Sequence, residues 1–519
     1  MFYIFTWVVM AIVFVVVNHL LFVVYMGYEI SFIWNLLFSV AVSSIILANE
    51  LRRPKHQEYL RHKALYPQIP KQYLQDKPIS ESVIFGKDHH TSKLVCAEIG
   101  HHTIICGSTG SGKTATCLIP TILSCDTGSK QIVDIKSREL SFKTGNLQDP
   151  NTMIIDLNRQ ADYVWGWNIF YKLKCNGEDT EQEVLDVLKE VASVVVPKTN
   201  SGDDFWNSSA RNEFIGLMLF EFVYKKNYEF IDCVKSILNI PLRDHIESAL
   251  DTVPKQSLVT SYLNGLSASA DETLFSVDIT LSQCLFPFLD ENIVYFLKTN
   301  KQRANPQMLN QDGITQYLCV DEHKLDTGYD RIFCIVMKQT LMELQARTTT
   351  GNYPQTQLIY DEFQKLSESV TEIRGTVASF LKTGRSKKTS LVLAFQNLDN
   401  IKKEEIYDML SNVHYLYVLS SNNSNSLTTE IVCKMAGSYY EKTHNYSEGR
   451  GTSLSTSFQE KPILKPEDLN NLGEDAVLII SNFGYVRTRK EGTAYYKTQP
   501  FKTQYEKTIT RNKDVMKDV

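Results

Sequence analysis

The fold of this chain can be inferred from one stretch, His101-His102-Thr103-Ile104-Ile105-Cys106-Gly107-Ser108-Thr109-Gly110-Ser111-Gly112-Lys113-Thr114. A short apolar run leads into the pattern Gly-x-x-x-x-Gly-Lys-Thr, and a helix-compatible segment, 115–123, follows directly. This succession of strand, glycine-rich loop and helix is the context that a phosphate-binding loop requires. The sequence therefore predicts a nucleotide site here.

The residue types in the loop indicate how it binds phosphate. Glycines allow a tight turn with inward backbone N–H groups, which form a nest for phosphate oxygens together with the start of the next helix. We expect Lys113 to reach the β- and γ-phosphates of ATP and the Thr114 hydroxyl to ligate Mg²⁺. The predicted nucleotide-binding residues are Gly107, Ser108, Thr109, Gly110, Ser111, Gly112, Lys113 and Thr114.

Length and composition indicate a large protein with more than one structural unit. The chain has 519 residues, enough for two or three units, and its net charge of −5 argues against a surface coated in positive charge. The ten cysteines include no Cys-x-x-Cys pair, so neither a cysteine-based zinc module nor a disulfide framework is indicated.

The first 50 residues predict a transmembrane hairpin. Segments 2–26 and 30–48 are almost entirely apolar and long enough to cross a bilayer. A signal peptide fits less well, because the first segment lacks a basic leading region and a second span follows. The positive charges after the hairpin place both termini in the cytoplasm; they are Arg52, Arg53, Lys55, Arg61 and Lys63. Residues 51–80 are expected to be a basic juxtamembrane linker.

The rest of the chain predicts an α/β fold. Short β-like runs alternate with helical periodicity at 370–382 and 427–435, which favours a mostly parallel sheet covered by helices. Between 181 and about 298 the β-like runs are absent, so this section is expected to be a helical insertion. The predicted strands are 130–135, 152–156, 331–336, 357–360, 389–395, 413–419 and 476–481.

The acidic half of the nucleotide site is predicted at Asp361 and Glu362. Both follow the apolar run 357–360, at the carboxyl end of a predicted strand. We expect Asp361 to hold Mg²⁺ and Glu362 to accept a proton from the attacking water, as in motors that hydrolyse ATP.

Two further residues are candidates for the reaction. Gln396 closes the strand 389–395, where a polar side chain can contact the γ-phosphate. Arg385 precedes the same strand, in a basic turn, and can stabilise charge in the transition state, commonly from the neighbouring subunit of a ring.

Together these motifs resemble the type IV secretion coupling proteins, the TraG/TraD-like family of inner-membrane ATPases. The resemblance extends over most of the chain. Besides the hairpin and the phosphate-binding loop, it is carried by Val-Asp-Ile-Lys-Ser-Arg-Glu-Leu (133–140), Asp-Asp-Phe-Trp-Asn-Ser-Ser-Ala (203–210), Tyr-Asp-Glu-Phe (360–363), the block 385–396, Lys-Pro-Ile-Leu-Lys-Pro-Glu-Asp-Leu (461–469) and Ala-Val-Leu-Ile-Ile (476–480).

The resemblance implies a RecA-like motor domain (81–180 and 299–501), an all-helical domain inserted into it (181–298) and a polar C-terminal tail (502–519). It also implies a homo-hexamer at the bacterial inner membrane. Such a protein uses ATP hydrolysis to pass a substrate, single-stranded DNA with its relaxase or a secreted protein, to the components of a secretion channel. The family's catalytic residues correspond to Lys113, Asp361, Glu362, Arg385 and Gln396.

One of the departures from the family pattern lies in the loop after the second strand. Relatives usually read Asp-Pro-Lys-Gly-Glu, whereas 134–139 is Asp-Ile-Lys-Ser-Arg-Glu, so the role of this loop is left open.

Two other functions remain to be weighed. One is an ATP-binding substrate receptor or scaffold at the channel, which would have no use for Glu362 and Arg385. The other is a chromosome-partitioning translocase for double-stranded DNA, which usually carries a separate DNA-reading domain for which the short tail leaves no room.

Overall fold

The computed structural model describes residues 61–136, 138–198, 204–365, 371–421, 423–447 and 453–513, together with the single residues 41, 44 and 59. The predicted transmembrane hairpin and most of the juxtamembrane linker up to residue 60 lie outside the described residues. Within the described part, no helix is long and apolar enough to cross a membrane.

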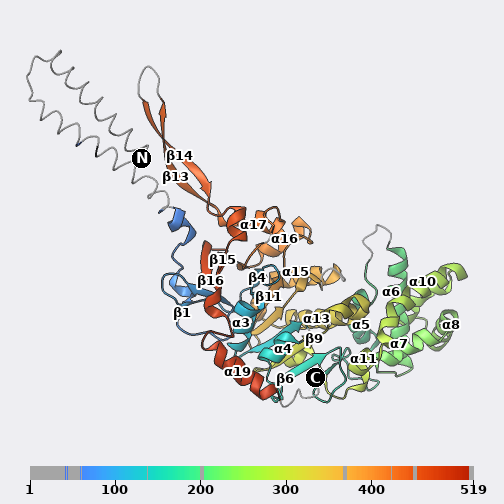
Figure 1. Cartoon of the computed structure of the whole chain (residues 1–519). Coiled ribbons are helices and arrows are strands. Elements are labelled where there is room, and N and C mark those ends of the chain that lie inside the picture. Colours follow the sequence, from blue (N-terminus) through green and yellow to red (C-terminus); the bar gives the residue numbers. More distant parts are fainter. Residues whose placement is uncertain are drawn as a thin grey trace, which may run out of the picture. The chain divides into compact units, whose positions relative to one another are not determined.

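A mixed sheet of twelve strands forms the centre of the larger structural unit, 68–436 with 465–519 (Figure 1). Across the sheet the strands are β1 (Leu74–Gln75), β3 (Leu94–Cys96), β2 (Ile84–Asp88), β16 (Gly484–Arg489), β15 (Asp475–Ile480), β12 (Tyr415–Val418), β4 (Thr103–Cys106), β11 (Thr389–Phe395), β10 (Thr356–Tyr360), β5 (Ser129–Asp134), β9 (Thr315–Cys319) and β6 (Thr152–Asp156).

The strands from β12 to β6 are parallel, and those from β1 to β15 pair antiparallel. Strands buried on both faces belong under helices, and β4, β5, β10 and β11 are buried along their whole length. The α/β prediction is therefore confirmed as a large mixed sheet with a parallel part. The carboxyl ends of the parallel strands all lie at one edge, which we call the carboxyl edge; the opposite edge is the amino edge.

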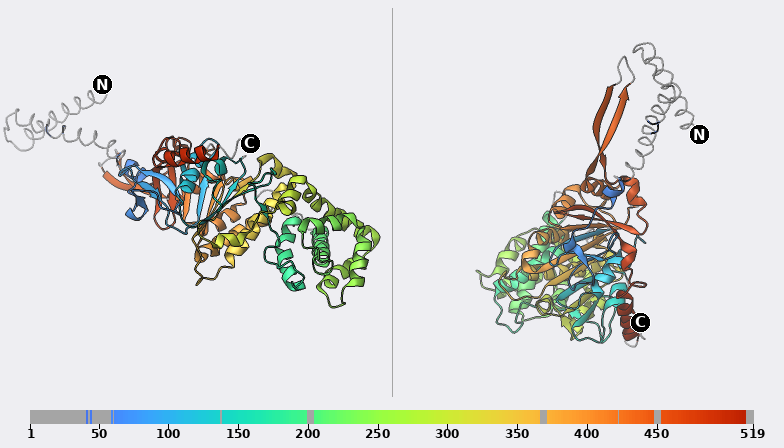
Figure 2. Two further views of the ribbon diagram at one scale, coloured as in Figure 1. Left: turned by 90° about the horizontal axis from the view of Figure 1, so that it is seen from below. Right: turned by 90° about the vertical axis from the view of Figure 1, so that its left-hand side faces the viewer.

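Helices cover both faces of the sheet (Figure 2). The π-helical turn η2 (Lys113–Leu118) continues directly into α3 (Ile119–Leu123), which packs with α4 (Glu139–Thr144) and α19 (Phe501–Asn512). The other helices around the sheet are α12 (Glu322–Lys324), α13 (Asp330–Gln345), α15 (Thr371–Thr383), α16 (Lys403–Ser411), α17 (Leu427–Ala436) and α18 (Pro466–Asn470).

The segment 181–298, for which the sequence predicts helices, contains no strand among its described residues. Its first helix begins with a capping box, in which Thr180 and Glu183 satisfy each other's backbone N–H groups. Figure 1 shows these helices gathered beside the sheet. They are α5 (Glu181–Val195), α6 (Phe205–Leu219), α7 (Phe230–Asn239), α8 (Leu242–Thr252), α9 (Leu258–Ser267), α10 (Asp271–Leu285) and α11 (Glu291–Val294), and the short pair β7 (Gly166–Trp167) and β8 (Arg303–Ala304) flanks them.

The smaller unit comprises 1–67 and 437–464. Its described part includes an antiparallel hairpin of β13 (Ser438–Ser447) and β14 (Ser453–Pro462), in which Ser438 pairs with Pro462 and Ser447 with Ser453. The sequence analysis did not predict this hairpin.

One predicted strand is wrong. Segment 331–336 lies inside helix α13, and Ile332 to Val336 are all buried there. A short continuous apolar run fits a buried strand and a buried helix equally well, and here the helix is 16 residues long. Conversely, β9 lies between β5 and β6 but was not predicted, because buried Gln316 interrupts its apolar pattern.

Segment 502–519, predicted as a polar tail, contains most of helix α19. Asn512 is fully buried; its amide nitrogen donates to the carbonyl oxygens of Phe142 (3.0 Å) and Gly145 (2.8 Å), and its oxygen accepts from the Leu147 backbone N–H (3.4 Å). The side chain thus satisfies backbone groups at the end of α4, and α19 belongs to the packed structure.

Replacing Asn512 with Ala should lower the free energy of unfolding by about 2–3 kcal/mol, because buried backbone groups lose their hydrogen-bond partner. The measurement is the shift in the urea midpoint. Thr510→Ala, an exposed position on the same helix, is the control and should change little. Equal shifts for both variants would contradict this role of Asn512.

Candidate nucleotide-binding site

The glycine-rich loop leaves the carboxyl end of β4 and enters η2. The Gly107 N–H donates to the Phe395 carbonyl at the end of neighbouring β11 (3.2 Å), which anchors the start of the loop. Gly112 has φ +94°, in the left-handed region that favours glycine, and a Cβ at Gly107 would lie 2.5 Å from the Ser111 Oγ. The left-handed φ requires glycine at 112, whereas a side chain at 107 would have to displace the Ser111 hydroxyl. The loop has the strand, turn and helix context that the sequence predicts.

The other loop side chains differ in exposure. Thr109 is exposed, whereas Ser111 and Thr114 are partly buried. The Ser108 hydroxyl lies 2.8 Å from the hydroxyl of Ser420, just after β12. This contact ties the loop to the strand on its other side.

Lys113 is buried inside the loop. Its Nζ donates to the Gly107 carbonyl (2.6 Å) and lies 3.7 Å from Glu362 Oε1, while its side chain is 5 % exposed. Burial lowers the pKa of Lys113, although the nearby carboxylates of Glu362 and Asp361 oppose this shift. A cationic group is thus held inside the glycine-rich loop, against the Gly107 carbonyl.

Asp361 and Glu362 directly follow β10, which is separated from β4 by β11 alone. Both side chains are 3 % exposed, and burial raises the pKa of Asp361. Glu362 has φ +49°, an uncommon conformation for a residue with a side chain. Its Oε2 is buried and has no hydrogen-bond partner among the described residues. Strain and an unsatisfied buried oxygen at one residue are typical of a functional position.

Lys136 joins this acidic pair, although the sequence analysis left its loop without a role. It follows β5, the other neighbour of β10, and its Nζ lies 2.6 Å from Glu362 Oε1 and 3.8 Å from Asp361 Oδ2. Burial lowers the pKa of Lys136, but the two carboxylates outweigh it and the net shift is upward. The sequence signal that could have identified Lys136 is its position two residues beyond the buried strand that ends in Asp134. Burial raises the pKa of Asp134 to about 7.

Gln396 and Arg385 lie at opposite ends of β11. Gln396 is partly buried and follows Phe395, whose carbonyl holds Gly107, so it lies at the carboxyl edge with the loop. Arg385 is exposed in the turn Gly384–Lys387, which precedes β11 at the amino edge. The structure therefore brings Lys113, Asp361, Glu362 and Gln396 to one edge and does not bring Arg385 there.

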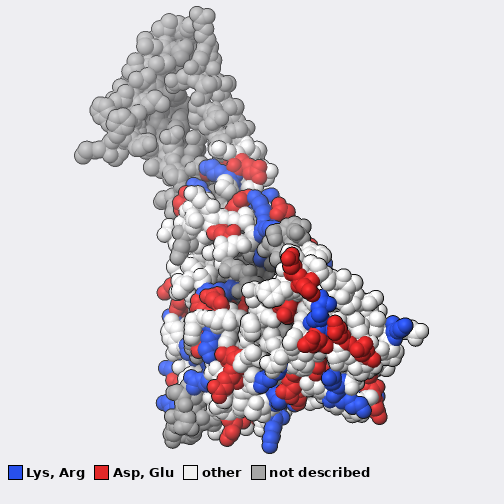
Figure 3. Space-filling view, turned by 90° about the vertical axis from the view of Figure 1, so that its right-hand side faces the viewer, with Lys and Arg blue, Asp and Glu red and all other residues white. Residues whose placement is uncertain are grey.

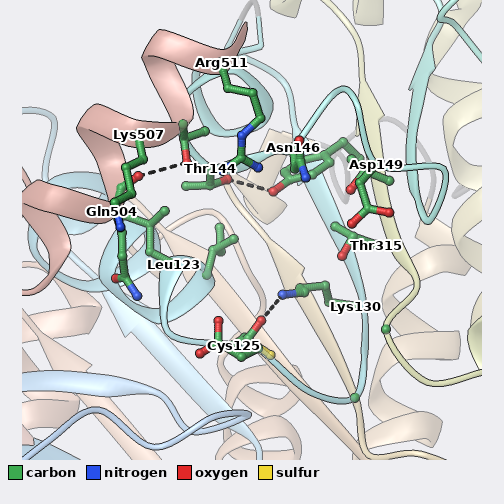
Figure 4. A pocket seen from close by; sticks show the side chains of 17 residues that line it. Leu123, Cys125, Lys130, Thr144, Asn146, Asp149, Thr315, Gln504, Lys507 and Arg511 are labelled. Atoms are coloured by element: carbon green, nitrogen blue, oxygen red, sulfur yellow. Dashed lines mark hydrogen bonds between the residues drawn. The ribbon is translucent and has the colours of Figure 1, made fainter.

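A cavity of about 310 Å³ lies elsewhere, at the amino edge of β5, β6 and β9 (Figure 4). Helix α19 contributes Lys507 and Arg511 to its wall, and Lys130 lines the opposite side, where its Nζ donates to the Cys125 carbonyl. No residue of the glycine-rich loop lines this cavity. It is distinct from the nucleotide-binding site.

Replacing Lys136 with Met should lower the free energy of unfolding by about 1–3 kcal/mol at pH 8, because the buried carboxylates of Asp361 and Glu362 lose a countercharge. The loss should be smaller at pH 5. Without Lys136 the pKa of Asp361, which burial already raises, rises further. Protonation of Asp361 at low pH therefore removes part of the loss, and the stability of the variant falls as pH rises.

The test compares urea midpoints at the two pH values. Lys136→Arg keeps the charge and serves as the control, which should show a much smaller pH-dependent difference from the unmodified chain. A Lys136→Met loss that is the same at pH 5 and pH 8 would contradict the electrostatic role of Lys136.

Comparisons with known proteins identify the family. The family model described as type IV secretory system conjugative DNA transfer matches residues 62–518. A comparison with curated protein sequences gives no match.

Among solved structures, the unbound bacterial conjugative coupling protein TrwB, lacking its first 70 residues, is 15% identical, with 75% of this chain and 85% of that chain covered and a TM-score of 0.59. TrwB structures described as complexes with a non-hydrolysable ATP analogue and with ADP and Mg²⁺ cover 75% of this chain, each with a TM-score of 0.57. At these identities the structural likeness concerns the fold. The family model spans most of the described residues, and the chain belongs to the type IV secretory system conjugative DNA transfer family.

Proposed function

We propose that this protein is a membrane-anchored ATPase that couples ATP hydrolysis to the transfer of DNA, with its relaxase, into a type IV secretion channel. One observation carries the proposal: the phosphate-binding loop with its buried lysine and the buried acidic pair, in which Glu362 has an uncommon backbone conformation, follow two strands that are separated by a single strand. The proposed substrate is single-stranded DNA or a secreted protein, the partners are the channel components, and the acting form is a homo-hexamer.

The proposed domain arrangement follows the element order. The proposed RecA-like motor, 81–180 and 299–501, contains the sheet and its helices except β1 and most of α19, and the helices of 181–298 are proposed to be an all-helical insertion. Residues 1–50 are proposed to anchor the motor in the bacterial inner membrane with both termini cytoplasmic.

The residues at the carboxyl edge fit ATP and Mg²⁺. The left-handed glycines Gly110 and Gly112 allow inward amides, Lys113 already lies within the loop, and the orphaned Oε2 of Glu362 is available to a water molecule. Thr114 and Asp361 supply the oxygens that Mg²⁺ prefers. When bound, Mg²⁺ neutralises charge on the phosphate oxygens.

Each side chain then has a defined task. The loop amides and Lys113 bind and orient the phosphates, which requires Lys113 to exchange the Gly107 carbonyl for a phosphate oxygen. Glu362 accepts a proton from the attacking water at a carboxylate oxygen, and Lys136 orients that carboxylate through its contact at 2.6 Å. Gln396, which follows β11 at the same edge, is proposed to contact the terminal phosphate.

Charge at the surface is consistent with a motor that holds its substrate transiently. On the face shown in Figure 3, acidic and basic side chains are interspersed. A chain with a net charge of −5 is not expected to bind the DNA backbone strongly over its whole surface. Contacts with DNA are therefore expected within a local surface or pore of the assembled ring.

Lys113→Ala should lose nucleotide binding and hydrolysis, whereas Glu362→Gln should keep nucleotide binding and lower kcat by about 10²–10⁴-fold through loss of the general base. The measurements are nucleotide affinity, ATPase activity with single-stranded and duplex DNA, and plasmid transfer between cells. Glu430→Gln, the same change in an exposed ion pair with Lys403, is the control and should leave all three unchanged. If both site variants still transferred DNA normally, the motor function would be wrong, and a purely binding receptor would fit better.

Arg385 is proposed to act on the nucleotide site of a neighbouring copy, because in its own chain it lies at the amino edge. Arg385→Ala should lower kcat by about a thousandfold. Mixing Arg385→Ala with Lys113→Ala copies should restore activity, since some interfaces then pair an intact loop with an intact arginine. Random mixing in a closed ring predicts roughly a quarter of the unmodified activity.

The control for subunit exchange is co-purification of differently tagged copies. An inactive mixture in which the two variants demonstrably co-assemble would contradict action from a neighbouring copy. It would leave the ATPase assignment intact, since that depends on Lys113 and Glu362.

A further inference from the structure

Three potential metal ligands meet at the amino edge of the sheet, outside the nucleotide-binding site. Glu98 and His101 lie in the loop between β3 and β4, and His414 lies just before β12, more than 300 residues later. One ligand atom from each residue can be chosen so that all three lie within 4.8 Å of one another. The two imidazole rings are close, with centroids 4.5 Å apart.

Both histidines have a hydrogen-bonding partner at Nδ1. His101 Nδ1 lies 3.3 Å from the Glu98 backbone carbonyl. A carbonyl oxygen only accepts, so Nδ1 carries the hydrogen and Nε2 presents its lone pair. Metal-binding histidines commonly donate the other ring N–H in this way, which sets the tautomer and orients the ring.

The Nδ1 of His414 has a different partner, a hydroxyl group, which can either accept or donate the hydrogen bond. Its Nδ1 lies 2.7 Å from the Ser481 hydroxyl, at the end of β15. Its Nε2 is buried and has no hydrogen-bond partner among the described residues. A buried imidazole nitrogen without a partner is costly, and a metal ion in the cluster would supply that partner.

Packing holds the cluster in place before any metal binds. The Glu98 backbone N–H donates to the Tyr415 hydroxyl (2.9 Å), which fixes the loop against β12. Both imidazoles pack edge-on against the Tyr415 ring, with centroid distances of 6.0 Å for His101 and 4.6 Å for His414. The ligands are therefore positioned by a buried aromatic side chain.

The electrostatics favour neutral imidazoles, which is the form that binds metals. Burial lowers the pKa of His101 and of His414, and the positive charge of Arg385 adds to the effect on both. The negative charge of Glu98 acts in the opposite direction. Glu98 thus supplies the one anionic ligand of the cluster, and Arg385 supplies a nearby opposing charge.

We propose that Glu98, His101 and His414 form a binding site for a divalent transition-metal ion of the Zn²⁺ class. Two imidazole nitrogens and one carboxylate suit Zn²⁺, whereas Mg²⁺ prefers oxygen ligands alone. Three protein ligands leave a fourth tetrahedral position for water or for a group from another molecule. The proposed ligands are distinct from the nucleotide-binding residues of the same chain, because the cluster lies at the opposite edge of the sheet from Lys113 and Glu362.

The experiment uses the purified full chain in mild detergent, freed of metal with a chelator and titrated with Co²⁺, a coloured substitute for Zn²⁺. We expect one equivalent to bind with a tetrahedral visible spectrum that lacks a thiolate charge-transfer band, and Zn²⁺ to displace it. The absence of that band separates this cluster from the ten free cysteines of the chain.

Substitutions of different residues should change the affinity for Co²⁺ in opposite directions. Glu98→Gln and His414→Gln should each weaken Co²⁺ binding by about tenfold or more through loss of a ligand. Arg385→Ala should tighten binding a few-fold, because it removes a positive charge that opposes the metal ion. His323→Gln removes an exposed imidazole on α12, away from the cluster, and should change nothing.

Each variant is first compared with the unmodified chain in metal-free thermal unfolding and in nucleotide binding, so that a folding defect is recognised. Metal should raise the unfolding temperature of the unmodified chain and of His323→Gln, because both have an intact site. It should raise the unfolding temperature of Glu98→Gln and His414→Gln much less. The proposal is overturned if the unmodified chain binds no Co²⁺, if the spectrum is that of thiolates, or if Glu98→Gln and His414→Gln bind as tightly as the unmodified chain. In those cases the histidines are a packing pair.

Discussion

The buried charge of Lys113 is the constraint on which the nucleotide-binding site depends. A lysine that is 5 % exposed needs compensation, and it receives this from the Gly107 carbonyl and the Glu362 carboxylate. Lys136, which is partly exposed, in turn balances the buried carboxylates of Glu362 and Asp361, so two cations and two anions form one network. The network is incomplete, because one oxygen of Glu362 has no partner among the described residues. Such a group remains available for a ligand.

Parallel strand order brings these groups together. The loops that follow β4, β5, β10 and β11 all lie at the carboxyl edge. They meet there although more than two hundred residues of sequence separate β5 from β10. The long helical segment 181–298 occupies part of that separation. Binding sites at the carboxyl ends of strands are general for open α/β sheets. The amino edge carries a different set of groups: Arg385, the histidine and glutamate cluster, and the cavity beneath α19.

Local patterns predicted a large part of this arrangement. The loop 107–114 and the strands ending at Tyr360 and Phe395 agree with the structure, since glycine spacing and continuous apolar runs are local signals. Segment 331–336 was predicted as a strand and is a helix, because a short apolar run does not distinguish the two. Strand β9 and the antiparallel strands β2, β3 and β16 were missed, since their apolar patterns are short or interrupted.

By itself, the sequence determined the phosphate-binding loop, the acidic pair and the α/β class, because each depends on residues that are neighbours in the chain. Only the tertiary structure decided that Lys136 contacts Glu362, that Asn512 completes α4, and that His101 lies beside His414. The separation in sequence is 226 positions for Lys136 and Glu362, 367 for Asn512 and Gly145, and 313 for His101 and His414. Their existence depends on which strands are adjacent in the sheet and which helices cover them, and no local periodicity records that order.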